Sequence, residues 1–328
     1  LPDIFNLKNI IPYFVDNLER KSFTTKLISV NYIFEILYSF NYNDLVLPIT
    51  EYNYFDSYIF PALLRLYYSE KHELILEFFN NVDKMIDLEE KFLNITLKSR
   101  LIKYKNILNN VNETNKNNTG QTGETTQDKV NTNNTLITKK DKKNEIFKDY
   151  ETSLKLFKDE LFKVTMDLIG KINEIDILIA SIRKLPNLIS FYGKSKSSDF
   201  LKFIVNNFNK PDWIIQKEIL MQIPKMIGTL GEKVLNDYLL LCIEMLVSNN
   251  SNEIKTYELI KTIHELLKMG YLQHDSASSI FTKLLPYLVH PNLLIRYEVT
   301  DLTKSIINYL TQDEIYELIF QNLSEYFN

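Results

Sequence analysis

The chain has 328 residues, of which 45% are hydrophobic and 24% charged, and its formal net charge is -4. These values are typical of an ordinary soluble protein, and they give no electrostatic support for nucleic-acid binding. The single cysteine, Cys242, excludes an internal disulfide, and no apolar run approaches the roughly 20 residues of a membrane span.

Residues 1–105 are predicted to form two helical hairpins. Apolar residues recur at helical spacing from Ile10 to Leu18, and a second stripe runs from Leu27 to Leu37. Ranges 58–68 and 74–88 repeat the arrangement. Glycine and proline are scarce, at 7 and 9 residues, which favours long helices over turn-rich β folds.

Helical periodicity stops in residues 106–145, where Asn, Thr, Lys and Gly dominate. Such a segment buries too little apolar surface to offset the entropy of ordering it. We therefore predict a disordered low-complexity insertion. The threonines leave a second interpretation open, a regulatory loop that is phosphorylated.

Residues 146–328 are predicted to form hairpins three to six and the start of a seventh, in one continuous solenoid. One stripe runs from Leu154 to Leu168 and the next from Ile175 to Ile189, where Gly193 is the expected C-cap. Further helices are predicted at 200–208, 212–230, 234–247, 254–269, 279–289, 292–310 and 313–327. The last helix has an apolar face that needs cover, and the chain does not begin with Met. We therefore expect it to be a piece of a longer protein.

An internal repeat is visible in the strings 209–216 and 289–296. Their prolines, Pro211 and Pro291, are 80 positions apart (291 − 211), or two units of 40. The unit between them is predicted to place Ile254-Lys255 in register with Ile215-Gln216 and Ile295-Arg296. Two helices in about 40 residues are typical of HEAT repeats. The predicted fold is an all-α, HEAT-type α-solenoid of about six hairpins plus a terminal helix.

The residues of the repeat turn have local roles that the sequence predicts. Pro211 and Pro291 each stop a helix, and Asp212 and Asn292 are good N-caps for the helices that follow. Trp213 is expected to pack at a repeat boundary, and the alternative is an exposed binding anchor.

The second turn adds three residues to this structural motif. His290 is expected to occupy the turn itself. Arg296 is expected to join a ladder of bonds to the neighbouring repeat, and the alternative is a contact with a partner. Tyr297 follows it in the same string.

No constellation of residues for chemistry is evident. The four histidines are far apart, and no zinc motif or glycine-rich phosphate loop occurs. Cys242 lies in an apolar run and is expected to be a core thiol. Glu89-Glu90 and Asp313-Glu314 are expected on the solvated surface. We predict no catalytic, cofactor-binding or metal-binding residue, and a protein that works by holding other proteins.

Several strings resemble one family. Residues 284–297, with His290-Pro291-Asn292 followed by Ile295-Arg296-Tyr297, are similar to the helical-repeat region of the regulatory subunit of class III phosphatidylinositol 3-kinase. Asp212-Trp213, Tyr58–Leu64 and Asp149–Leu154 resemble further family strings in the same order. The early turns at 19–21 and 69–71 depart from the family pattern, so the first repeats are divergent.

The resemblance implies a parent protein with an N-terminal serine/threonine-protein-kinase-like domain, this solenoid and a C-terminal WD-repeat propeller. It implies a non-catalytic scaffold segment that holds the lipid kinase catalytic subunit and a Beclin-type subunit. The parent is expected to be myristoylated and cytoplasmic, peripheral on endosomal, vacuolar and autophagic membranes, in sorting and autophagy. For this segment we expect no cofactor, no nucleic acid, no direct membrane insertion and no obvious homo-oligomer.

Two alternatives stay open at this point. The chain could be a HEAT-repeat adaptor of another class, such as a nuclear transport receptor or a phosphatase scaffold. An enzyme of α/α type would need convergent acidic side chains in one cavity.

Overall fold

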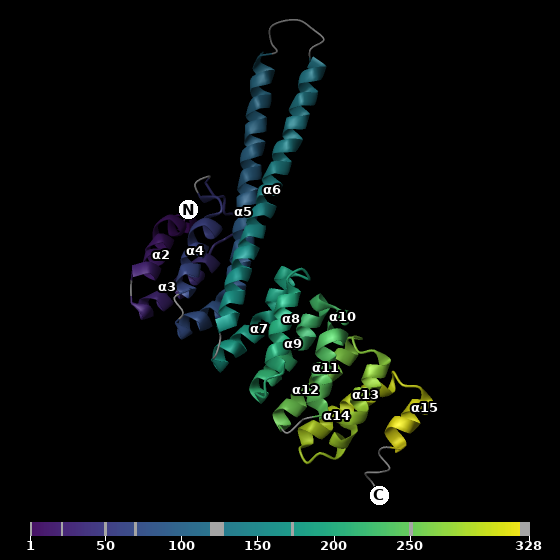
Figure 1. Cartoon of the computed structure of the whole chain (residues 1–328). Helices are drawn as coiled ribbons and strands as arrows, with labels where there is room; N and C mark the ends of the chain where they lie inside the picture. Colours follow the sequence, from purple (N-terminus) through teal and green to yellow (C-terminus); the bar gives the residue numbers. More distant parts are fainter. Residues whose placement is uncertain are drawn as a thin grey trace. The chain divides into compact units, whose positions relative to one another are not determined.

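The computed structural model describes residues 2–20, 22–48, 51–68, 71–118, 128–171, 174–248 and 252–321. Every helix or strand assigned in these ranges is a helix, which confirms the predicted all-α fold. The chain divides into two compact units, Leu1–Ile172 and Asn173–Asn328, which are described separately below (Figure 1).

Unit 1 begins with two helix pairs. The first helix is built from α1 (Pro2–Phe5), η1 (Asn6–Ile10) and α2 (Ile11–Arg20), and it pairs with α3 (Phe23–Tyr38). The second pair consists of η3 (Phe55–Ile59) with α4 (Phe60–Tyr67), followed by α5 (His72–Asn118). Both predicted hairpins of residues 1–105 are therefore present, although the fourth helix is much longer than expected.

Helices α5 and α6 (Asp128–Lys171) lie side by side along their length (Figure 1). Residues 106–118 continue α5 and residues 128–145 begin α6, which differs from the predicted disordered insertion at 106–145. The rest of that insertion, 119–127, lies outside the described residues. A helix that is already nucleated in a packed pair gains one hydrogen bond for each residue added, so even a polar sequence can extend it. The division between the units falls at 172/173, not at the insertion.

Aromatic side chains join η3, α4, α5 and α6 in the core of unit 1. Phe55 stacks on Phe92 with ring centroids 5.8 Å apart, and Phe60 meets Phe157 at 4.5 Å. All four rings are buried. Aromatic rings bury a large apolar area each, so this cluster fixes how the segment before α4 packs on the two long helices.

Unit 2 opens with α7 (Ile175–Tyr192) and continues as helix pairs. The pairs are α8 (Ser197–Phe208) with α9 (Trp213–Leu230), α11 (Leu240–Ser248) with α12 (Glu253–Lys268), and α13 (His274–Leu284) with α14 (Leu293–Ile307). Short segments complete it: α10 (Glu232–Val234), η4 (Leu235–Leu239), η5 (Leu285–Val289), α15 (Gln312–Glu314) and η6 (Ile315–Gln321). The predicted helices of this region are present within a few residues. Residues 322–327 of the predicted last helix lie outside the described residues.

Helix α7 and the second helices of the three pairs form one layer, in which α7, α9, α12 and α14 pack in that order (Figure 1). Gly193 ends α7 with φ 68°, which confirms the predicted C-cap, and Gly231 ends α9 with φ 89°. Only glycine adopts this backbone conformation readily, and it lets the chain reverse at once into the next helix.

The N-caps correct the predicted repeat register. Asp212, Asn252 and Asn292 cap α9, α12 and α14, so the caps are 40 and 40 residues apart (252 − 212 and 292 − 252). Lys255, and not Ile254, therefore occupies the position of Ile215 and Ile295. The sequence match aligned one apolar residue with another, whereas the cap decides where the helix begins. Lys255 is buried, and burial lowers the pKa of its ammonium.

Candidate partner-binding surface at the repeat turns

The two repeat turns are built by side-chain caps, as the sequence predicts. The Asp212 Oδ1 atom accepts from the backbone N–H groups of Ile214 and Ile215 at 2.8 and 3.3 Å. Asn292 caps α14 by accepting from the N–H of Leu294 at 3.0 Å. These bonds satisfy donors that would otherwise be unpaired at the start of each helix.

The second turn is further ordered by His290 and by a bond between repeats. The His290 Nδ1 atom accepts from the N–H of Asn292 at 3.1 Å, so His290 lies in the turn as predicted. The Asn292 amide donates to the Glu253 carboxylate at 2.7 Å. This bond places the first turns of α12 and α14 next to each other.

Five apolar side chains are exposed at the beginnings of α9, α12 and α14, and we call them the repeat-turn strip. Their exposed fractions run from 36% to 67%: Trp213 36%, Ile254 51%, Leu293 67%, Leu294 65% and Tyr297 67%. Single exposed apolar residues are ordinary, whereas a group held in the 40-residue register is a candidate interaction surface. This strip is the candidate functional site of the chain.

The position of Trp213 corrects the expectation that it packs at a repeat boundary. Its side chain is 36% exposed, while Ile215, two residues later, is buried. Residues two apart on a helix are separated by about 200°, so the face that buries Ile215 directs Trp213 outward. The exposed-anchor alternative fits the structure better.

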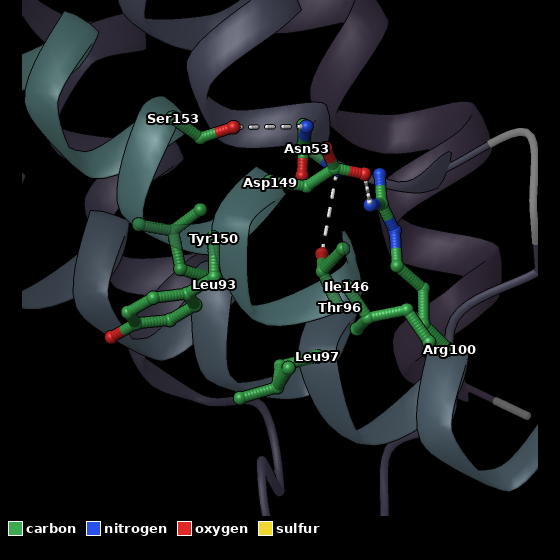
Figure 2. A pocket seen from close by; sticks show the side chains of 9 residues that line it. All are labelled: Asn53, Leu93, Thr96, Leu97, Arg100, Ile146, Asp149, Tyr150 and Ser153. Atoms are coloured by element: carbon green, nitrogen blue, oxygen red, sulfur yellow. Dashed lines mark hydrogen bonds and ion pairs between the residues drawn. The ribbon is translucent and has the colours of Figure 1, made fainter. Parts of the chain in front are cut away.

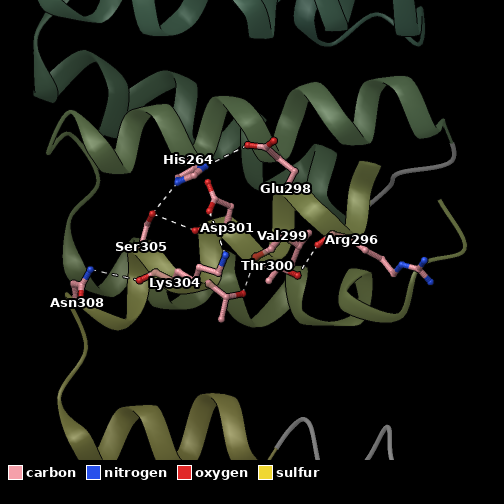
Figure 3. Close-up of polar contacts among 10 residues, drawn as sticks. His264, Arg296, Glu298, Val299, Thr300, Asp301, Lys304, Ser305 and Asn308 are labelled. Carbon is pink, nitrogen blue, oxygen red and sulfur yellow. Dashed lines mark hydrogen bonds and ion pairs between the residues drawn. The ribbon is translucent and has the colours of Figure 1, made fainter. Parts of the chain in front are cut away.

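Arg296 does not make the predicted bond to a neighbouring repeat. Figure 3 shows its guanidinium extending away from the polar contacts between α12 and α14, and within the described ranges the guanidinium has no hydrogen bond or ion pair. Its backbone carbonyl accepts from Thr300 at 2.7 Å. Arg296 therefore lies beside Tyr297 as a cation available to a partner.

Other residues, which the sequence analysis missed, connect the layer of second helices. His264 on α12 contacts Glu298 through Nδ1 at 3.3 Å and Ser305 through Nε2 at 2.8 Å, both on α14 (Figure 3). This order resembles a Ser-His-acid triad, but His264 is only 2% exposed, so we interpret the contacts as a tie between helices. The only signal for these contacts in the sequence is that His264 lies 34 residues before Glu298 and 41 residues before Ser305, close to the length of one repeat.

A bidentate ion pair connects α7 with α9. Arg183 donates from Nε and Nη2 to the two carboxylate oxygens of Glu218 at 2.8 and 3.1 Å. The Glu218 carboxylate is buried, and this hydrogen bond raises the pKa of the Arg183 guanidinium. Thr262 of α12 in turn donates to the Leu220 carbonyl of α9 at 3.0 Å. Hydrogen bonds or ion pairs thus connect each two neighbouring helices of the layer. The helices that carry the repeat-turn strip are therefore held in fixed positions relative to one another.

A shallow groove on the first helices of unit 2 offers a second apolar surface. It has a volume of about 270 Å³ and is lined by Ser198, Leu201, Lys202, Val205, Asn206 and Tyr238. Tyr238 is 53% exposed at its edge. A groove of this size suits a side chain of a partner better than a drug-sized ligand.

A polar seam in unit 1 is structural. Arg100 pairs with Asp149 at 2.7 Å, and Asn53 bonds to Ser153 through its amide at 3.5 Å and to Thr96 through its backbone N–H at 3.4 Å (Figure 2). These residues enclose a small cavity, in which the centre of a water molecule can move through only about 10 Å³. That is room for about one water molecule, so this cavity cannot hold a substrate.

Cys242 is buried, and burial raises the pKa of its thiol, which confirms the predicted core thiol. Among the described residues, no group of three or more His, Cys, Asp or Glu side chains could bind a metal. The described helices also include none with the length and apolar character needed to cross a bilayer.

Comparison with known proteins identifies relatives along the whole chain. The family model described as "PIK3R4-like, middle domain" matches residues 1–328. A Dictyostelium discoideum protein named "Probable serine/threonine-protein kinase vps15" is 23% identical over 334 residues, which cover 99% of this chain and 15% of the relative. A Candida glabrata "non-specific serine/threonine protein kinase" is 23% identical over 186 residues, 56% of this chain and 13% of the relative. The chain thus spans a small part of the length of the relatives it matches.

A solved structure has a similar fold. The crystal structure of Cex1p matches with a TM-score of 0.51 and 14% sequence identity, over 95% of this chain and 48% of that chain. At this identity the similarity concerns the fold alone.

Proposed function

Because the chain belongs to the PIK3R4-like middle-domain family, the helical region of the regulatory subunit of class III phosphatidylinositol 3-kinase, we propose that it is a scaffold segment that holds this lipid kinase complex together. The match of the family model to residues 1–328 is the observation that carries the proposal. The same match favours this proposal over the nuclear transport receptors and phosphatase scaffolds that the repeat pattern alone left open.

The proposed mechanism is the presentation of a firm surface. Exposed tryptophan, tyrosine and arginine side chains are typical anchors of protein interfaces. Trp213, Tyr297 and Arg296 have this character, while Asp212 and Asn292 fix the turns that present them. Pro211, His290 and Pro291 complete the turns. A partner that covers the strip would remove five exposed apolar side chains from water.

The partners and the location are the finer part of the proposal. The two relatives are named as serine/threonine kinases, which supports a kinase-like domain in the parent outside this segment. We propose that the segment contributes to binding of the lipid kinase catalytic subunit and of a Beclin-type subunit. The complex would hold it at endosomal, vacuolar and autophagic membranes for sorting and autophagy. We also keep the prediction that residues 146–328 are part of one continuous solenoid with residues 1–105.

The test is recovery of the lipid kinase catalytic subunit with the full-length parent protein. A double variant, Leu293→Asp with Tyr297→Asp, should reduce that recovery while the melting temperature stays close to that of the parent, since both side chains are exposed. Ile28→Asp is a matched control, because Ile28 is 49% exposed on α3 of unit 1, whereas the strip belongs to unit 2.

Two outcomes would overturn different parts of the proposal. If the parent recovers no lipid kinase under conditions that preserve the complex, the scaffold function is wrong. If the double variant and the control recover equal amounts of lipid kinase, the function stands and the repeat-turn strip is not its surface.

A further inference from the structure

Glu89 is a buried carboxyl group without a partner. It lies on α5 with 0% of its surface exposed, and neither carboxyl oxygen has a hydrogen-bond partner in the structure. From the sequence, Glu89 and Glu90 are both expected on the solvated surface. Glu90 is exposed as expected, and the prediction for Glu89 is wrong. A bare carboxylate is very unfavourable in such a site, so the packed chain must hold Glu89 in its neutral form.

In the described part of the chain, the only charge that bears on the pKa of Glu89 is that of Asp56, which is also acidic. Helix α5 packs against α3, α4, η3 and α6. From η3, Asp56 acts on Glu89, and from α6, Glu160 acts on Asp56. Tyr150 of α6 also lies close, since Glu90 and Glu89 both act to raise its pKa. On the α3 side Tyr38 lies beside Asp87, and on the α4 side Tyr67 lies near Glu77, twelve residues (89 − 77) along α5 from Glu89.

Two cations of α5, Lys91 and Arg100, are paired with other carboxylates. Lys91 pairs with Asp87 at 2.7 Å and lies over the Tyr38 ring on the α3 side of the helix. Arg100 pairs with Asp149, about three turns along α5. Three carboxyl groups, Asp56, Glu89 and Glu160, are thus gathered where η3, α5 and α6 meet.

We propose that this η3–α5–α6 junction is a proton-binding site, in which Glu89 takes up a proton when η3 packs on α5 and releases it when that packing opens. The arrangement of the elements gives the reason. Phe55 of η3 stacks on Phe92, one turn along α5 from Glu89, so the aromatic contact that holds η3 also seals the carboxyl from water. Opening of this contact would therefore expose Glu89 to water.

The pKa values of Glu89 and Asp56 are both raised, as expected for carboxyl groups that are buried close to other carboxyls. Burial, with a contribution from Asp56, raises the pKa of Glu89 from 4.5 to about 9. Burial and the charge of Glu160 raise the pKa of Asp56 from 3.8 to about 6. For an acid whose folded-state pKa is raised, stability is fully present below the unfolded pKa and is lost as pH rises to the folded one. Packing of η3 should therefore weaken from about pH 4.5 to pH 9.

Hydrogen exchange of the whole 328-residue chain between pH 5.5 and 9 tests this inference. After correction for the intrinsic exchange rate, the opening constant of amides in 55–60 should rise by up to about tenfold per pH unit, as expected for release of one proton. Glu89→Gln should remove most of that slope, because the amide does not titrate. Glu90→Gln, at the exposed neighbour, should leave it unchanged. Equal slopes in the parent and Glu89→Gln would overturn the proposal.

Two further measurements keep the test decisive if the Glu89 variant fails to fold. Asp56→Asn should move the upper end of the transition to lower pH, because the charge that hinders ionisation of Glu89 is gone. In the unmodified chain, the infrared carbonyl band of a protonated carboxyl group should be present at pH 7 and disappear as pH approaches 10. Absence of any protonated carboxyl at pH 7 would refute the site without a variant.

Discussion

The ion pair between α7 and α9 allows a quantitative test of how the layer of second helices is held. Replacing Arg183 by Met removes both charged hydrogen bonds to Glu218 and keeps the aliphatic stem. The buried carboxylate is then left with the Gln222 amide at 3.5 Å as its remaining side-chain donor. Loss of hydrogen bonds to a charged group costs about 1.5–3 kcal/mol, and an unpaired buried charge about 3–5 kcal/mol.

The accessibility of the two partners decides between these ranges. The Arg183 side chain is 60% exposed and the Glu218 side chain 6%, so water reaches the pair from the arginine side. Screening by that water favours the lower range, about 1.5–3 kcal/mol. For a unit of 156 residues (328 − 172), this corresponds to a decrease of roughly 3–12 °C in melting temperature.

The assay is urea denaturation with a double-mutant cycle of Arg183→Met and Glu218→Gln. The double variant should be more stable than the sum of the two single losses predicts, because with Glu218 replaced it no longer contains a buried, unpaired carboxylate. Lys304→Met is the control, since Lys304 pairs with Asp301 at 3.7 Å on the surface and should cost less than about 1 kcal/mol. Equal losses for Arg183→Met and Lys304→Met, or strict additivity in the cycle, would refute the reasoning.

Three other predictions follow from burial and charge. Trp213→Ala should cost less than the roughly 3–5 kcal/mol of a buried tryptophan, because Trp213 is 36% exposed; a loss in that range in thermal melts would show it buried in solution. Leu302→Ala should cost about 2–5 kcal/mol since Leu302 is 1% exposed, whereas Leu294→Ala should be near neutral, and similar denaturant midpoints for the two would contradict the packing of α14. A hydrogen bond to Asp275 and the charge of Glu314 raise the pKa of His274 above 6.5, so its contribution to stability is lost as pH rises through that raised value. An NMR titration should place the midpoint above 6.5 and show it falling in Glu314→Gln; no shift between the two would remove Glu314 as a cause.

The exposed strip and the buried carboxyl show why local sequence misplaces single side chains. The sequence predicts Trp213 at a repeat boundary from its position after the turn proline, and Glu89 on the solvated surface from its charged neighbours. In the structure Trp213 is 36% exposed and Glu89 is fully buried. The reason is that other elements leave the helix face of Trp213 partly open and cover that of Glu89. Asp56 and Glu160, which bear on Glu89, lie 33 residues before it and 71 residues after it (89 − 56 and 160 − 89).

Features that depend on contacts within one or two helical turns could be predicted from the sequence. Apolar residues at a spacing of 3.6 gave the helices, and Asp212, Asn292 and Gly193 marked ends that the structure confirms, because a cap bonds to backbone groups two to four residues away. Three features could be established from the packed helices alone: the 40-residue cap register through Asn252, the contacts of His264 with α14 and the burial of Glu89. These depend on which helix face meets which neighbour, and packing between segments distant in sequence fixes that choice.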